Sequence, residues 1–108
     1  MKNYQEEAYE FAVYNKDFSS DLLYPFFGLS EEVGEVNSIV AKRIRKGFKP
    51  LPSSGHAQYW DMISELGDVL WMVAACCTEL GYDMDQVMIL NIEKLKQRQK
   101  DEEICDHE

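Results

Sequence analysis

The chain has 108 residues, 45% hydrophobic and 29% charged, a length and balance that indicate one globular domain over residues 1–108. Eleven Lys and Arg residues against 20 Asp and Glu residues give a formal net charge of −9. This negative charge argues against nucleic-acid binding, which requires basic side chains to neutralise phosphates. The sequence has neither an apolar run of roughly 18 residues nor a signal-peptide pattern, so we expect a cytoplasmic protein with no membrane partner.

Apolar residues recur with a helical period along the whole chain, and no segment alternates as a strand would. This pattern predicts a first helix over residues 2–16. A second helix begins between residues 22 and 30 and ends in a basic turn at Gly47, which is typical of a helix C-terminus. Its start is open, because Pro25 suits a first turn whereas Ser30 would suit a new N-cap after a break.

Two more helices are predicted after a loop that contains two prolines. The third covers residues 57–80 and ends at Gly81, and it is apolar on nearly all faces. Such a helix must be buried on nearly all sides, so we expect a second subunit to cover part of it. A capping-box pattern at Asp83 opens a fourth helix to about Lys100, followed by a frayed acidic tail over 101–108. The predicted fold class is all-α, a four-helix bundle completed by oligomerisation.

Acidic residues stand in pairs on the second and third predicted helices. Glu32 and Glu35 are three residues apart and therefore share a helix face, and Glu65 and Asp68 repeat this spacing. The second pair interrupts the most apolar segment, where a carboxylate is costly unless a cation compensates it. If the helices pack antiparallel, four carboxylates converge, and oxygen ligands without histidine favour Mg²⁺ or Mn²⁺ over a di-iron centre. The alternative is solvated surface charge.

These motifs resemble those of a known family. Glu-Glu-x-Gly-Glu at 31–35, followed by Glu-x-Gly-Asp-Val-Leu-Trp at 65–71, is similar to the MazG-like nucleotide pyrophosphohydrolases of the all-α NTP pyrophosphatase superfamily, over roughly residues 22–100. The resemblance implies a homodimer or homotetramer that hydrolyses nucleoside triphosphates to monophosphates and pyrophosphate. It also implies Mg²⁺ binding by the four carboxylates and a role for Glu31 in orienting or deprotonating the attacking water. Phosphoribosyl-ATP pyrophosphohydrolase is the alternative within the superfamily, and Trp71 favours the MazG-like assignment.

Residues on the second and fourth helices are candidates for substrate contacts. MazG-like proteins carry an Asn and a Lys on the fourth helix that contact phosphate or sugar, and Asn91 and Lys94 resemble them. Arg98 continues this stripe, and Lys42 belongs to a basic cluster at the end of the second helix. The alternatives are a solvated face for the first three and compensation of the helix dipole for Lys42. A catalytically inactive interaction module, in which the acidic helices bind a protein, is the rival from another functional class.

Cysteines and tryptophans are assigned mainly to the core. Cys76 and Cys77 are adjacent in the apolar third helix and lack metal-ligand spacing, so we expect them to be buried as small hydrophobic residues. Trp60, Trp71 and Tyr82 have rings suited to stacking on a base, but core packing is the preferred prediction for Trp71. Base selectivity is expected to reside in the N-terminal helix and in the loop after Gly47.

Overall fold

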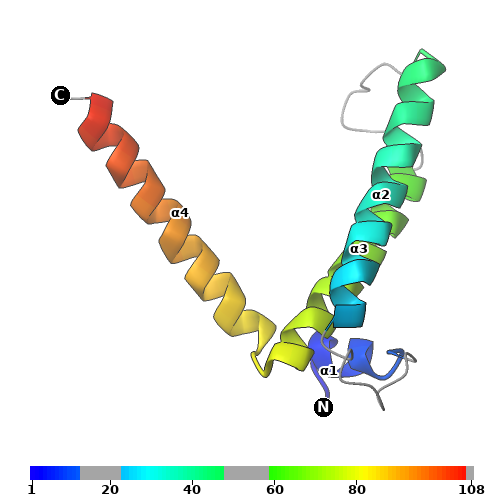
Figure 1. Cartoon of the computed structure of the whole chain (residues 1–108), viewed down its shortest axis with the longest axis horizontal. Coiled ribbons are helices and arrows are strands. Elements are labelled where there is room, and N and C mark those ends of the chain that lie inside the picture. The colour runs from blue at the N-terminus through cyan, green and yellow to red at the C-terminus, as the bar shows by residue number, and fades with distance from the viewer. Residues whose placement is uncertain (13–22, 48–58, 107–108) are drawn as a thin grey trace.

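A computed structural model describes residues 1–12, 23–47 and 59–106 of the chain. These parts contain four helices and no strand, which confirms the predicted all-α class. In chain order the helices are α1 (Tyr4–Tyr9), α2 (Leu23–Arg45), α3 (Trp60–Leu80) and α4 (Met84–Asp106), as Figure 1 shows.

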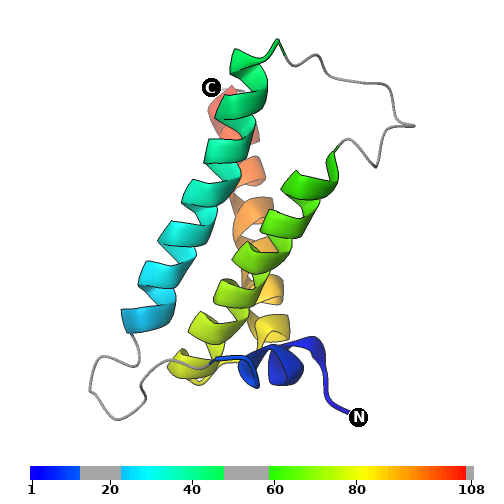
Figure 2. The same ribbon diagram turned by 90° about the vertical axis from the view of Figure 1, so that its right-hand side faces the viewer.

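Helices α2 and α3 lie side by side and antiparallel (Figure 2). Helix α2 is continuous from Leu23, with Pro25 in its first turn, where the missing N–H costs no intrahelical hydrogen bond. Ser30 therefore does not cap a new helix, and its hydroxyl donates back to the Phe26 carbonyl at 3.4 Å. The predicted C-terminal glycine is confirmed, because Gly47 has a φ of +78° directly after the basic last turn.

Helix α3 ends as its sequence predicts. Gly81 takes a left-handed conformation with a φ of +79°, and its N–H donates to the carbonyl groups of Cys77 and Thr78. Residues 57 and 58 of the predicted third helix lie outside the described residues. The C-terminal half of α3 supplies most of the buried core, and both predicted core cysteines are buried there: the buried residues of this helix are Met72, Ala74, Ala75, Cys76 and Cys77.

Helix α1 is short and crosses the C-terminal half of α3 (Figure 2). It begins after Asn3, whose side chain accepts a hydrogen bond from the Glu6 N–H. The side-chain amide of Gln5 donates to the Tyr82 carbonyl at 2.8 Å, and its oxygen accepts from the Met84 N–H at 2.7 Å. One side chain thus joins α1 to the turn between α3 and α4. Positions 13–16 of the predicted first helix lie outside the described residues.

Helix α4 diverges from α2 and α3, so that one chain does not close a four-helix bundle by itself (Figure 1). Its start agrees with the predicted capping box, since the Asp83 N–H donates to the Gln86 side chain at 3.0 Å. The helix continues to Asp106, past the end near Lys100 that the sequence predicts. No glycine or proline interrupts this stretch, and an i,i+4 hydrogen bond from Gln97 supports it. Among the described helices, none is long and apolar enough to cross a membrane.

Candidate metal centre

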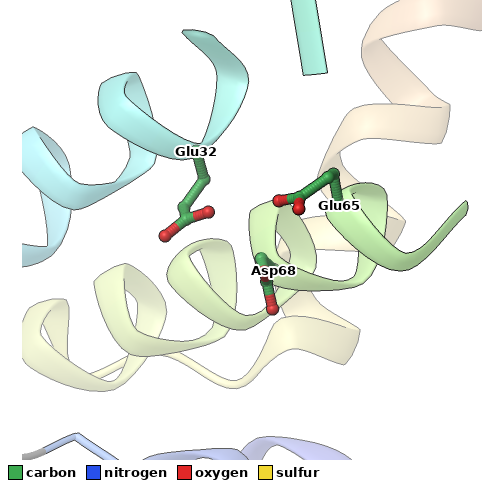
Figure 3. Close-up of side chains that lie close together, drawn as sticks. All are labelled: Glu32, Glu65 and Asp68. Carbon is green, nitrogen blue, oxygen red and sulfur yellow. The ribbon is translucent and has the colours of Figure 1, made fainter. Parts of the chain in front are cut away.

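Three carboxylates from two helices converge between α2 and α3. Glu32 comes from α2, whereas Glu65 and Asp68 come from α3, and one oxygen of each lies within 4.8 Å of the others. Figure 3 shows Glu32 and Glu65 pointing toward one another across the two helices. The i,i+3 spacing of Glu65 and Asp68 places both on the face of α3 that meets α2. The antiparallel packing of α2 and α3 is what brings them together.

Two of these carboxylates have an oxygen without a partner. Glu32 Oε2 and Glu65 Oε2 are both buried, and neither has a hydrogen-bond partner among the described residues. A buried carboxylate oxygen without a donor is unfavourable, because the charge loses its hydration and gains nothing in return. This geometry suits a cation that takes both oxygens as ligands.

The electrostatics of the cluster also favour a cation. Burial raises the pKa of Glu65, and the neighbouring carboxylates of Glu35 and Asp68 raise it further. Burial likewise raises the pKa of Glu32, followed by the charges of Glu35, Asp68, Glu65 and Glu31. A divalent ion would relieve this repulsion between the carboxylates.

The donor set fits a hard divalent ion. All the converging ligand atoms are carboxylate oxygens, and these are the ligands that Mg²⁺ and Mn²⁺ prefer. Glu35 lies outside the group of three but faces Glu65 closely enough to raise its pKa. Three of the four predicted ligands therefore form the cluster, and the fourth stands beside it. Glu31, the predicted base, is exposed next to them and lines a small cavity that also touches Glu32.

Cavities with aromatic walls adjoin the cluster on the side of α1. The larger measures about 450 Å³ and extends from the rings of Tyr4 and Phe11 to Asp68. The smaller measures about 200 Å³ and touches both Glu31 and Glu32. Phe11 and Trp71 line both cavities.

Trp71 occupies a place between the two roles considered for it. It is half-buried, and its indole N–H donates to the Ala8 carbonyl at 3.0 Å, which fixes the ring against α1. It is therefore partly a packing residue, as predicted, and partly a cavity wall. Tyr4 was not predicted as a site residue. Burial and the nearby Asp68 carboxylate raise its pKa above the ordinary tyrosine value.

Basic residues gather at the other end of the α2–α3 groove. A cavity of about 490 Å³ is lined by Ile39, Lys42, Arg43 and Lys46 at the end of α2 and by Asp61 of α3. The Arg43 guanidinium donates to Asp61 at 2.8 Å and so joins the two helices at this end. Lys42, a predicted phosphate contact, lines the same cavity together with Lys46.

The structure does not bring the α4 candidates to the carboxylates within one chain. Asn91, Lys94 and Arg98 are exposed on α4, which diverges from α2 and α3 (Figure 1). Trp60 and Tyr82, two of the candidates for base stacking, are exposed as well. Their roles stay predictions.

Comparison with known proteins agrees with the site geometry. A family of MazG nucleotide pyrophosphohydrolase domains matches residues 25–102, a range that contains all four predicted ligands and excludes α1. Neither the curated proteins nor the solved structures gave a match. The matched range covers most of the chain and carries the convergent carboxylates of α2 and α3. The chain thus belongs to the MazG nucleotide pyrophosphohydrolase domain family.

Proposed function

We propose that this protein hydrolyses nucleoside triphosphates, ribo or deoxy, to the nucleoside monophosphate and pyrophosphate with the help of Mg²⁺. Family membership supports pyrophosphohydrolase activity on nucleotides in general. The observation that supports metal dependence is the pair of buried carboxylate oxygens of Glu32 and Glu65, which lack a hydrogen-bond partner in the described chain. The family match also favours this activity over phosphoribosyl-ATP pyrophosphohydrolysis.

The residues of the cluster would hold the ion and leave room for the substrate. Glu32, Glu65 and Asp68 supply the convergent oxygens, and Glu35 stands beside them. A bound Mg²⁺ neutralises charge on phosphoryl oxygens and lowers the pKa of a coordinated water. An acidic protein needs such help, since its net charge of −9 would otherwise repel a polyanion.

The proposed role of Glu31 is to take a proton from the attacking water. The water oxygen forms a bond to phosphorus, the bond between phosphorus and the α–β bridging oxygen breaks, and the released group leaves with that electron pair. The products are the monophosphate and pyrophosphate, and the proton passes to the Glu31 carboxylate. Glu31 is exposed at the cavity rim beside Glu32, so it can return the proton to solvent.

A substrate panel tests this proposal. The purified chain is incubated with Mg²⁺ and each of the common NTPs and dNTPs, and the products are separated by ion-exchange chromatography. Monophosphate and pyrophosphate in equal amounts are expected. No turnover of any nucleotide would favour the inactive interaction module, while release of inorganic phosphate would indicate a different bond specificity.

A further inference from the structure

Basic, acidic and aromatic residues follow one another along α3, first where this helix faces α2 and then where α1 crosses it. On α3, Asp61, Glu65, Asp68 and Trp71 are spaced four, three and three residues apart, so they share one face. At a rise of 1.5 Å per residue this row is about 15 Å long. It begins beside the basic cavity, passes the carboxylate cluster and ends at the aromatic cavities.

The facing row on α2 has the same order in the antiparallel direction. Glu32 and Glu35 stand at the carboxylates, and Lys42 and Lys46 follow two and three turns later on the same side. Both lysines are exposed and line the basic cavity, whereas Arg43 beside them is held by Asp61. No salt bridge within the described residues engages either lysine.

At the end of the row where α1 crosses α3, the walls are apolar. Phe11 is 68% exposed although its ring forms a wall of both cavities there, so a flat ligand can reach it. Trp71 is held in place by its hydrogen bond to Ala8. Asp68 belongs to both the larger cavity and the carboxylate cluster, which makes the two sites contiguous.

We infer that a nucleoside triphosphate binds lengthwise along this row of sites on α3, with its base against Phe11 and Trp71 and its two terminal phosphates beside Lys42 and Lys46. This inference rests on the proposed function. The order of the three sites matches the order of base, scissile phosphate bridge and terminal phosphates in the substrate. Aromatic faces stack on any base, and lysine ammonium groups neutralise the negative charge of the two terminal phosphates.

Phe11 directly follows α1 and lies outside the part of the chain that the MazG family matches. Helix α1 is held against α3 by hydrogen bonds of Gln5, Tyr9 and Trp71. A base contact from Phe11 would therefore come from outside the matched domain.

Separate binding of the two products tests the orientation without any turnover. Isothermal titration calorimetry in the presence of Mg²⁺ measures the Kd of pyrophosphate and of the nucleoside monophosphates for the full chain and three variants. The Lys42→Ala/Lys46→Ala double variant should weaken pyrophosphate binding about tenfold and leave monophosphate binding unchanged. Phe11→Ala should do the reverse, weakening the monophosphate about tenfold. Arg45→Ala removes an exposed cation of α2 that does not line the cavity, and it should change neither.

The outcomes separate this inference from the proposed function. Lysine substitutions that weaken the monophosphate, or a Phe11 substitution that weakens pyrophosphate, would reverse the orientation and overturn it. Effects no larger than those of Arg45→Ala would overturn it as well. Absence of hydrolysis by the unaltered chain would remove the proposed function, whereas the two product affinities would still report how this row of sites is divided. Circular dichroism of each variant confirms that the helices are intact.

Discussion

Substitution of Glu35 or Asp68 is the most direct test of whether these carboxylates bind the metal ion. Activity should disappear on addition of EDTA and return with Mg²⁺ or Mn²⁺. Glu35→Gln and Asp68→Asn should each lower kcat/KM by at least about 100-fold, because even partners that only orient metal ligands contribute 10- to 100-fold. Steady-state kinetics with the best substrate of the panel measure the effect.

A matched control separates ligand loss from loss of charge. Glu93→Gln makes the same chemical change at an exposed position of α4 and should retain full activity. If Glu35→Gln or Asp68→Asn retained full activity with the helices intact, the carboxylates of α2 and α3 would not be the metal ligands.

The raised pKa of Glu65 sets the sign of a stability prediction. A carboxyl group whose pKa is higher in the folded state than in the unfolded state stabilises the fold below its unfolded pKa of about 4.3. That contribution is lost as the pH rises through the folded pKa, because the charged form is half-buried beside other carboxylates. At pH 7 in EDTA, Glu65→Gln should therefore raise the Tm.

Differential scanning fluorimetry between pH 4 and pH 8 checks this prediction. The gain should shrink as the pH falls toward 4, where the glutamate of the unaltered chain is protonated too. Mg²⁺ should raise the Tm of the unaltered chain more than that of the variant. A large loss of stability at pH 7 would show instead that Glu65 belongs to a structural hydrogen-bond network.

At the level of elements, Gly28 controls how closely α2 approaches α3. A Cβ at this position would lie 2.5 Å from Met72 Sδ, so Gly28→Ala forces Met72 or the helix to shift. Overpacking of this kind costs about 1–3 kcal/mol of unfolding free energy. Gly34 in the same helix has nothing within 4 Å of such a Cβ, and Gly34→Ala should stabilise by about 0.5–1 kcal/mol through helix propensity.

Urea denaturation of both variants in EDTA measures the two free energies. The two substitutions should change the free energy of unfolding in opposite directions, because helix propensity alone would make both of them stabilising. Equal stabilisation would mean that α2 and α3 do not pack closely at Gly28.

The helices that could be predicted from the sequence are those that local chemistry specifies. Gly47 and Gly81 end α2 and α3 where predicted, since a left-handed residue after a helical run has few substitutes. The start of α2 could not be decided, because Pro25 and Ser30 each satisfy a different rule for a helix N-terminus. Helix α4 runs past Lys100 to Asp106, because charged residues with good helix propensity continue a helix as readily as they follow its end.

The candidate site also has one part that the sequence predicts and another that it does not. The i,i+3 carboxylates on two helices predicted the cluster, because helix geometry fixes which side chains share a face. The aromatic cavities could not be predicted, since they arise where α1 crosses α3 through contacts such as the Trp71 hydrogen bond to Ala8, 63 positions apart. Periodicity within an element carries no information on such a crossing.

At the scale of the whole molecule, a single chain leaves much apolar surface open. Its radius of gyration is 18.0 Å, compared with about 13 Å for a compact chain of this length. Its accessible surface is 8639 Å², compared with about 6,200 Å² for a compact monomer of its mass. Large hydrophobic side chains are exposed on both α3 and α4, among them Ile63, Leu66, Leu70, Val87, Leu90, Ile92 and Leu95.

A second copy of the chain can cover these surfaces, because a two-fold axis would pair the exposed apolar faces of α3 and α4 with the same faces of the second copy. The excess of about 2,400 Å² is in the range of obligate dimer interfaces. We therefore predict a homodimer or a dimer of dimers whose Tm rises with protein concentration. Sedimentation equilibrium at low micromolar concentration should give twice or four times the 12.6 kDa chain mass.

Two substitutions on α4 sharpen the prediction of a dimer. Leu90 is 57% and Leu95 is 45% exposed in the single chain, so the Leu90→Glu/Leu95→Glu variant should cost a monomer little. In an assembly that buries α4, two added carboxylates would be desolvated, and the variant should dissociate or lose most of its cooperative unfolding. Gln99→Glu, which adds charge at an exposed polar position of the same helix, should leave the mass unchanged. A well-folded 12.6 kDa species of the unaltered chain would contradict the prediction, because the open faces of α3 and α4 would then be stable in water.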